Sequence, residues 1–200
     1  MAFLNGLFTA ALDTNVVFAQ LIGMLTVMLL ARRSWETLRV SAILGGISLV
    51  AGLIGSFFYA GLLQPWGVAY LAPIAFVLID LGVAFAAGTI AGRGKGHDER
   101  YALLRRYALL GASSAVMGVS FSTYAGIAAE TATFESGLGT VIGSALGVFL
   151  ACALYGFVRD RIDERLVPKA MRGLPIELVT AAIMALAFTG VAGIASGMFA

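Results

Sequence analysis

Two acidic residues stand inside long apolar stretches of the sequence, where a charge is costly. Asp13 and Asp80 are each flanked on both sides by runs of uncharged residues. A charged side chain at the centre of a bilayer costs about 2.5–3.5 kcal/mol on insertion scales, so such acids usually face the interior of a helix bundle. We predict that the two carboxyl groups coordinate an ion or carry a proton inside a bundle. The alternative is a neutral acid, or one bonded to a nearby hydroxyl or backbone group.

Uncharged polar side chains accompany the acids in two segments. Asn15 and Gln20 follow Asp13, and a second segment holds Ser113 and Ser114. We include these four residues with the two acids in a predicted ion path. For Asn15 and Gln20 we favour the structural alternative, in which their amides form hydrogen bonds across helices.

The remaining polar residues give little support for chemistry. His97 has no second His or Cys nearby, which is weak support for a metal site. Glu130 and Glu135 are expected on a solvated face, and Cys152 is expected to be a small apolar packing residue. The sequence contains no phosphate-binding loop, catalytic triad or HExxH pattern. We therefore predict no catalytic residue and no metal ligand, and the single cysteine excludes a cluster held by this chain's cysteines alone.

The composition identifies the elements that must position these residues. Of 200 residues, 60% are hydrophobic and only 12% are charged. An average soluble domain carries about 25% charged residues, so most of this surface must face lipid. The net charge of +2 is too small to argue for nucleic acid. The chain is predicted to be an all-α integral membrane protein.

Charge-free stretches predict six transmembrane helices. A helix needs about 20 apolar residues to cross about 30 Å of hydrocarbon. Residues 40–79 contain no charge, and Gln64-Pro65-Trp66-Gly67 is the turn that divides this stretch into two spans. The predicted spans are 4–31, 38–63, 67–92, 103–128, 136–158 and 175–198.

The basic residues predict the orientation. All 13 Lys and Arg residues fall at the first, third and fifth loops. The positive-inside rule makes these loops cytoplasmic, so both termini are predicted to be extracytoplasmic, in a bacterial or archaeal cytoplasmic (inner) membrane. The residues are Arg32, Arg33, Arg39, Arg93, Lys95, Arg100, Arg105, Arg106, Arg159, Arg161, Arg165, Lys169 and Arg172.

The six spans divide into two halves of three, approximately 1–97 and 98–200, within a single membrane domain. Because three is odd, a tandem duplication places the second half upside down. Each half opens with a span that is polar near its centre, and paired interrupted segments mark the midplane site of inverted-repeat transporters. We therefore predict two inverted three-helix repeats. Glycines at four-residue spacing, such as Gly139, Gly143 and Gly147, are expected to pack helices within this bundle.

Several motifs carry a resemblance to a known family. They are Thr14-Asn15 with Gly23, Glu36-Thr37, the segment 63–71 around Pro65-Trp66-Gly67, Arg159-Asp160-Arg161-Ile162, Val167-Pro168 and the segment 180–190. The chain resembles the six-span membrane subunits of the Rnf complex and of the Na⁺-translocating NADH:quinone reductase (Nqr), particularly the Rnf A and Nqr E type. The resemblance implies an inverted three-plus-three fold that pairs with a homologous six-span subunit. It also implies a [2Fe–2S] cluster between the two, with one cysteine from span 1 and one from span 4 of each.

This chain departs from the family at the cluster positions. Leu25 and Ser114 stand where the family has its two cysteines. Leucine cannot ligate iron, and serine is a poor substitute for thiolate. We expect that the cysteines of this chain hold no cluster; partner subunits could hold a [2Fe–2S] group and flavins.

Two functions follow from these observations. The first is a membrane subunit of an Rnf/Nqr-like ion-translocating electron-transport complex, acting as scaffold, ion path or both. The alternative is a cluster-less relative that acts as a stand-alone or homodimeric transporter of ions or small solutes.

Overall fold

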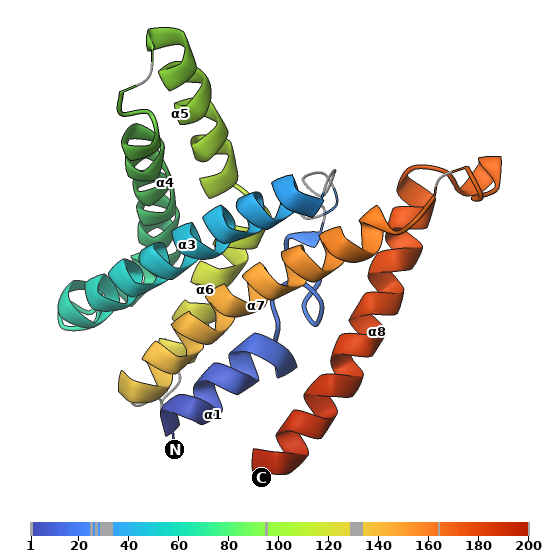
Figure 1. The fold of residues 1–200 in the computed structure, drawn as a ribbon. Coiled ribbons are helices and arrows are strands. Elements are labelled where there is room, and N and C mark those ends of the chain that lie inside the picture. Colours follow the sequence, from blue (N-terminus) through green and yellow to red (C-terminus); the bar gives the residue numbers. More distant parts are fainter. Residues whose placement is uncertain are drawn as a thin grey trace.

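The structure is a computed structural model that describes residues 2–24, 26, 28, 34–94, 96–128, 134–163 and 165–199. Within these residues every regular element is a helix (Figure 1). The α-helices are α1 (Ala2–Phe8), α3 (Ser34–Phe58), α4 (Ala72–Ala91), α5 (His97–Gly111), α6 (Ser114–Ala128), α7 (Phe134–Asp160) and α8 (Leu174–Phe199). One turn of π-helix extends α1, as η1 (Thr9–Asp13), and another extends α3, as η2 (Tyr59–Leu63). The short 3₁₀ turns η3 (Ala69–Leu71) and η4 (Lys169–Met171) precede α4 and α8.

Four helices of the described chain are long and apolar enough to cross a membrane without a break. They are α3 with η2, η3 with α4, α7 and α8. A fifth crossing is formed if α5 and α6, which are bent by 45° at residues 112–113, count as one span. This broken span begins at His97, six residues before the predicted start. The first predicted span, 4–31, is not a continuous helix, because α1 and η1 give way to turns after Asp13.

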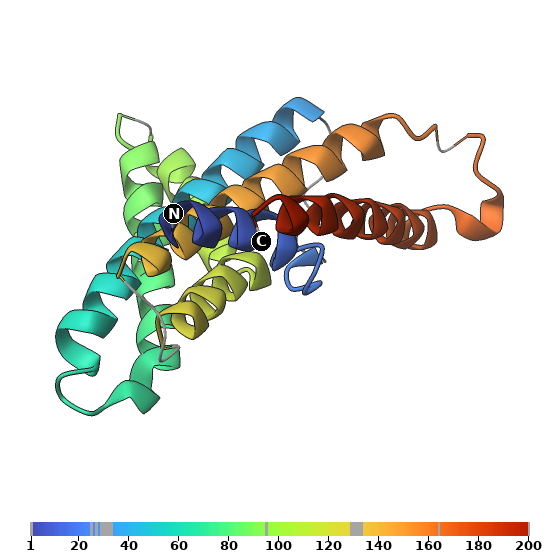
Figure 2. The same cartoon turned by 90° about the horizontal axis from the view of Figure 1, so that it is seen from below.

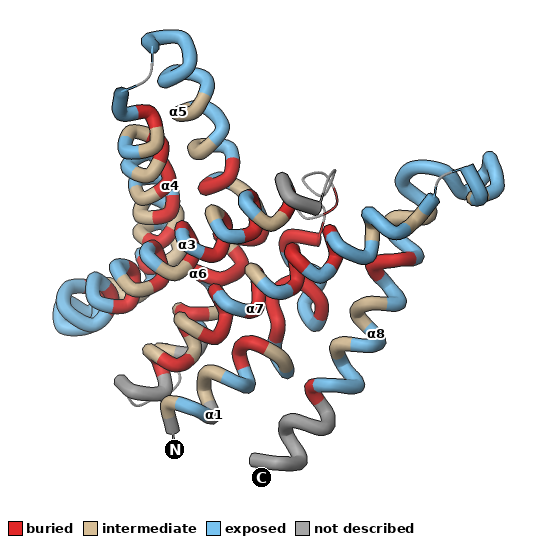
Figure 3. Tube along the Cα trace, viewed as in Figure 1, coloured by how far each residue is buried: buried red, intermediate tan, exposed pale blue. Residues whose placement is uncertain are grey.

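The centre of the bundle is built on α3 and α7, which lie side by side, with α6 packed against both (Figures 1 and 2). Small residues let these helices approach closely: the position of a Cβ on Gly45 of α3 is 3.4 Å from the carbonyl oxygen of Ala145 on α7. The buried residues follow this seam in Figure 3. Tyr155, Leu44 and Val116 are among the largest fully buried side chains.

The glycine row on α7 packs helices within this chain, as predicted. A Cβ at Gly139 would strike the backbone of Phe3, and one at Gly143 would strike the backbone of Leu7. These glycines therefore let the backbone of α1 pack directly against α7. The side chains at 193–199, where a second glycine pair lies, are outside the described part of the chain.

Two elements stand at opposite flanks of the centre. The pair α4–α5 projects on one side and α8 on the other (Figure 1). α8 is held at its start by Arg159 of α7, whose guanidinium lies 3.3 Å from Oε1 of Glu177. The hydroxyl of Tyr155 adds a 3.4 Å hydrogen bond to the carbonyl oxygen of Glu177. Most of the rest of α8 is exposed.

Candidate functional site

The first candidate element is the interruption that follows η1. Residues 14–23 form successive turns, and two of them have positive φ, Leu21 at 58° and Gly23 at 85°. A positive φ is uncommon for leucine and marks a backbone that its surroundings must hold in place. Irregular backbone at membrane depth is tolerated only where it is buried in protein or lines a cavity.

Asn15 supplies the hydrogen bonds that this turn lacks. Its Nδ2 donates to the carbonyl oxygen of Ala11 at 2.7 Å, and its Oδ1 accepts from the backbone N–H groups of Val17 at 2.9 Å and Phe18 at 3.1 Å. Gly147 of α7 makes room for this amide, because a Cβ there would lie 2.8 Å from Nδ2. Asn15 is fully buried, and its role is to satisfy the backbone of the interruption.

Gln20 acts in the same local way. Its Nε2 donates to the carbonyl oxygen of Thr14 at 3.1 Å. The expectation that Asn15 and Gln20 bond across helices is therefore wrong, since their described hydrogen bonds stay within residues 11–20. An unwound segment frees nearby backbone groups, and the closest side-chain amides pair with them.

The second candidate element is the break between α5 and α6. It contacts the interruption that follows η1. The hydroxyl groups of Thr26 and Ser114 lie 3.2 Å apart, at hydrogen-bonding distance. A Cβ on Gly23 would lie 2.5 Å from the Cα of Ala115, so the two backbones touch here. A Cβ on Gly118, one turn further along α6, would lie 2.6 Å from the side-chain Cγ2 of Ile22. The interruptions of the first and fourth predicted spans thus form one site.

The segments around this site carry exposed polar groups. Asp13, Thr14, Gln20 and Ser114 are exposed, although they stand between apolar segments. Ser113, next to the bend, is half-buried, and its Oγ has no described hydrogen-bond partner. Polar side chains exposed at membrane depth require water or another protein rather than lipid.

The second acid lies beside the α5–α6 break, because a Cβ on Gly111 would be 3.2 Å from the carbonyl oxygen of Asp80. Asp80 is in the middle of α4 and is fully buried. Its Oδ1 accepts a 2.7 Å hydrogen bond from the hydroxyl of Ser120 on α6, and its Oδ2 has no described partner. Asp13 is at the end of η1, which packs on α7 and α8, whereas α4 packs on α3, α5 and α6. The two acids therefore differ in both neighbours and exposure.

The donor groups at the meeting point do not fit an iron–sulfur cluster. Leu25 is outside the described residues, and the described side chains beside it and opposite it, Thr26 and Ser114, offer hydroxyl groups. The single cysteine, Cys152, is 3% exposed in the apolar core, where it clusters with Val148 and Tyr155. Such clusters are held by thiolates, and the described part of the chain presents none to the break.

The other polar residues singled out from the sequence form no further site within the described chain. His97 is exposed and lies 3.9 Å from Asp98, its neighbour in the chain. Glu130 is outside the described residues, and Glu135 belongs to α7, although its side chain is not described. Among the residues that the structure describes, no three His, Cys, Asp or Glu side chains form a metal-binding group.

Two residues in these hydrogen bonds, Thr26 and Ser120, were not predicted from the sequence to belong to a site. Thr26 stood beside the family's cluster position without an assigned role, and Ser120 was one of several hydroxyl residues in the fourth span. Both were polar residues inside apolar stretches, which is the signal that could have found them. Their partners, however, are 88 and 40 residues away.

The fold and the site define a class of protein: a helical membrane protein in which two interrupted segments, far apart in the sequence, meet. No protein-family model matches the chain. It is similar to the A subunit of the ion-translocating oxidoreductase complex of Alcanivorax borkumensis, with 30% identity over 190 residues that cover 94% of this chain and 95% of the relative. The chain therefore belongs to the family of A subunits of ion-translocating oxidoreductase complexes, and its resemblance to the Rnf A and Nqr E type is confirmed.

Other relatives match over the same extent. The A subunit of the Na(+)-translocating ferredoxin:NAD(+) oxidoreductase complex of Acetobacterium woodii is 28% identical over 190 residues, covering 94% of this chain and 96% of the relative. The A subunit of the ion-translocating oxidoreductase complex of Rhodobacter capsulatus is 26% identical over 192 residues, covering 96% and 97%. The similarity is thus a property of the whole chain.

Proposed function

We propose that this chain is a membrane subunit of a redox-driven ion-translocating complex, in which it serves as scaffold and ion path while other subunits carry the electrons. Membership of the A-subunit family supports the assembly, because the relatives are named as subunits of ion-translocating oxidoreductase complexes. These names do not favour the alternative of a stand-alone transporter.

The observation that carries the proposal is the meeting of the two interruptions at Thr26 and Ser114. Broken helices place free backbone groups and half-helix ends where an ion can be held, and they occur at the midplane of inverted-repeat transporters. The exposed polar side chains of Asp13, Gln20 and Ser114 need a polar neighbour rather than lipid. A homologous six-span subunit packed against these side chains would supply that neighbour and close the site.

The proposed arrangement has six crossings as two inverted repeats, with both termini outside a bacterial cytoplasmic membrane. Two features support it. The interruptions fall in corresponding positions, at residues 14–23 of the first half and 112–113 of the second. α1 begins and α8 ends on the same side of the bundle in Figures 1 and 2, which fits an even number of crossings.

The proposal assigns no electron-transfer step to this chain, since its described donor groups do not fit a cluster. Asp80 is assigned to the ion path because a buried carboxylate oxygen without a described partner has capacity to bind a cation or a proton. Asp13, Asn15, Gln20, Ser113 and Ser114 surround or support the broken segments.

The test is purification of the native assembly through a tag on this chain. We expect a second six-span subunit together with flavin- and iron-containing subunits, and electron-donor-driven cation uptake after reconstitution into proteoliposomes. Isolation of the chain alone, with solute flux that needs no electron donor, would instead establish the transporter alternative.

A further inference from the structure

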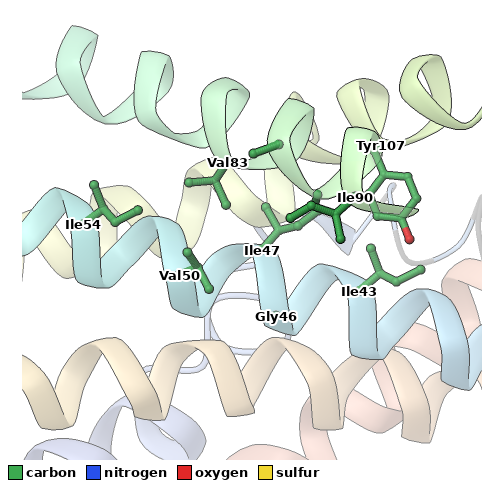
Figure 4. Close-up of a pocket in the computed structure, with 10 residues that line it drawn as sticks. Ile43, Gly46, Ile47, Val50, Ile54, Val83, Ile90 and Tyr107 are labelled. Atoms are coloured by element: carbon green, nitrogen blue, oxygen red, sulfur yellow. The ribbon is translucent and has the colours of Figure 1, made fainter. Parts of the chain in front are cut away.

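A second feature of the molecule lies on the flank formed by α3, α4 and α5, and residues 14–23 and 112–113 do not line it. An open groove of about 440 Å³ runs between these helices. Ile43, Ile47, Val50 and Ile54 of α3 line one wall, and Val83 and Ile90 of α4 line the other (Figure 4). The volume is within the range of about 300–1,000 Å³ that is typical of ligand sites.

The groove has the length of one bilayer leaflet. Ile43 and Ile54 are eleven residues apart on one helix, which corresponds to about 16 Å at about 1.5 Å per residue. The hydrocarbon core of a bilayer is about 30 Å thick, so each leaflet contributes about half of this length. An aliphatic groove of these dimensions fits a single acyl chain.

The residues at one end of the groove have arginines close to them in the sequence. Ile43, Ile90 and Tyr107 gather at the same end in Figure 4, and Tyr107 carries its hydroxyl there. Each of these residues is close in the sequence to an exposed arginine. Arg39 precedes Ile43 by one helical turn, Arg93 follows Ile90 by three residues, and Arg106 is adjacent to Tyr107. Basic pockets between transmembrane helices at the membrane surface attract anionic lipid headgroups.

We propose that this groove binds an anionic phospholipid, with one acyl chain between α3 and α4 and the phosphate beside Arg93 and Arg106. The length and the aliphatic walls select an acyl chain, and the arginines near one end select an anionic headgroup over a neutral one. The inference is independent of the proposed function, because it uses none of the residues at the two interruptions, 14–23 and 112–113.

Gly46 provides the means to block the site. It lines the groove, and a Cβ built on it meets no atom within 4 Å, so a larger side chain would occupy the groove without disturbing the fold. Gly82 of α4 is the matched control, because its Cβ also meets no atom within 4 Å and it does not line the groove. Arg161, in the loop after α7 on the opposite flank, is the control for the arginines.

The experiment uses the intact assembly in phosphatidylcholine nanodiscs that contain a trace of phosphatidylglycerol with a photoactivatable acyl chain. Parallel samples carry the same photoactivatable chain on phosphatidylcholine, and cross-linked peptides are identified by mass spectrometry. We expect the phosphatidylglycerol label on segments 43–54 and 83–90, in excess over the phosphatidylcholine label by about five-fold for each arginine that contacts the phosphate. Gly46→Leu should abolish this labelling, and Gly82→Leu should leave it unchanged.

The headgroup is tested separately from the groove. The double variant Arg93→Gln/Arg106→Gln should reduce phosphatidylglycerol labelling to the level of phosphatidylcholine, while Arg161→Gln should not. If Gly46→Leu does not assemble, Val50→Phe narrows the same groove from an exposed position. Equal labelling by the two lipids would overturn the anionic assignment. Unlabelled groove segments in the assembly would show that another subunit covers the groove, and would refute the proposal.

Discussion

The hydroxyl of Ser120 donates a 2.7 Å hydrogen bond to Oδ1 of Asp80 and thereby joins α6 to α4 at a fully buried position. The other carboxyl oxygen, Oδ2, has no described partner. Leaving a buried polar atom unsatisfied costs about 1–3 kcal/mol, so a protein retains such a group when it has a use for it. The pair therefore has one oxygen that anchors two helices and one that is available to bind.

We expect Asp80→Asn to preserve the fold and to reduce ion movement. The amide oxygen still accepts the hydrogen bond from Ser120, so the stability should change by no more than about 1 kcal/mol, the net value of one hydrogen bond. The negative charge that could hold a cation or a proton is lost. The measurement is electron-donor-driven ion flux in proteoliposomes that contain the intact assembly.

Asp98→Asn is the control, since Asp98 is an exposed acid at the start of α5. Asp80→Leu should lower stability by about 1–3 kcal/mol, because it leaves the buried hydroxyl of Ser120 without its partner. Unchanged flux and ion dependence in Asp80→Asn would make this acid a structural hydrogen-bonding group. Asp13→Asn, measured in the same assay, tests whether the exposed acid also contributes to ion movement.

Gly23→Ala should disrupt the site more than Gly67→Ala. Both glycines have positive φ, 85° and 68°, so each substitution strains the backbone by about 1–2 kcal/mol. A Cβ at Gly67 meets no atom within 4 Å, whereas a Cβ at Gly23 would lie 2.5 Å from the Cα of Ala115. Overpacking adds about 1–3 kcal/mol, so Gly23→Ala should melt several degrees below Gly67→Ala. Equal melting temperatures would mean that the two broken segments do not touch.

Cys152→Ala should leave any [2Fe–2S] signal of the assembly intact. The thiol is buried among apolar side chains of α7 and is not one of the groups at the meeting of the broken segments. Alanine is used because it adds no polar atom to that core. The measurement is electron paramagnetic resonance of the purified complex before and after the change, with iron content as a second readout. Loss of the signal at unchanged subunit composition would assign Cys152 to a cluster.

Arg159→Gln should weaken the attachment of the start of α8 to α7. The guanidinium of Arg159 is 3.3 Å from Glu177, and the two side chains are only 16% and 20% exposed. An exposed ion pair contributes about 0–1 kcal/mol to stability, and breaking a buried pair costs about 3–5 kcal/mol. We therefore expect Arg159→Gln to lower the stability by an amount between these values. The measurement is the rate of proteolysis in the segment 161–173, which should rise when α8 is less firmly attached to α7. Arg161→Gln is the control, and the charge swap Arg159→Glu with Glu177→Arg should restore part of the stability.

The orientation can be tested with reporter fusions. We expect fusions at residue 200 to report an extracytoplasmic position and fusions within 94–99 to report a cytoplasmic one, because every Lys and Arg lies at the first, third or fifth loop of the six predicted spans. A cytoplasmic position at residue 200 would contradict the six crossings and, with them, the inverted repeat.

The sequence by itself determined the class of this protein, the extent of most helices and the family. These depend on local properties: apolar stretches long enough to cross lipid, charges that end them and polar residues that interrupt them. The interruption after Asp13 could be expected from Asn15, Gln20 and the nearby glycine, and the second from the serines near Gly111. The local amide bonds of Asn15, in contrast, depended on how the chain unwinds there.

Only the tertiary structure decided which of these residues meet. The pairs Thr26–Ser114 and Asp80–Ser120 join positions 88 and 40 residues apart, and Gly147 makes room for Asn15 from a third helix. The physical reason is that a helix exposed to lipid can be apolar on every side. No polar stripe then marks its inward face, so its rotation, and with it the partner of each polar side chain, follows from packing against its neighbours.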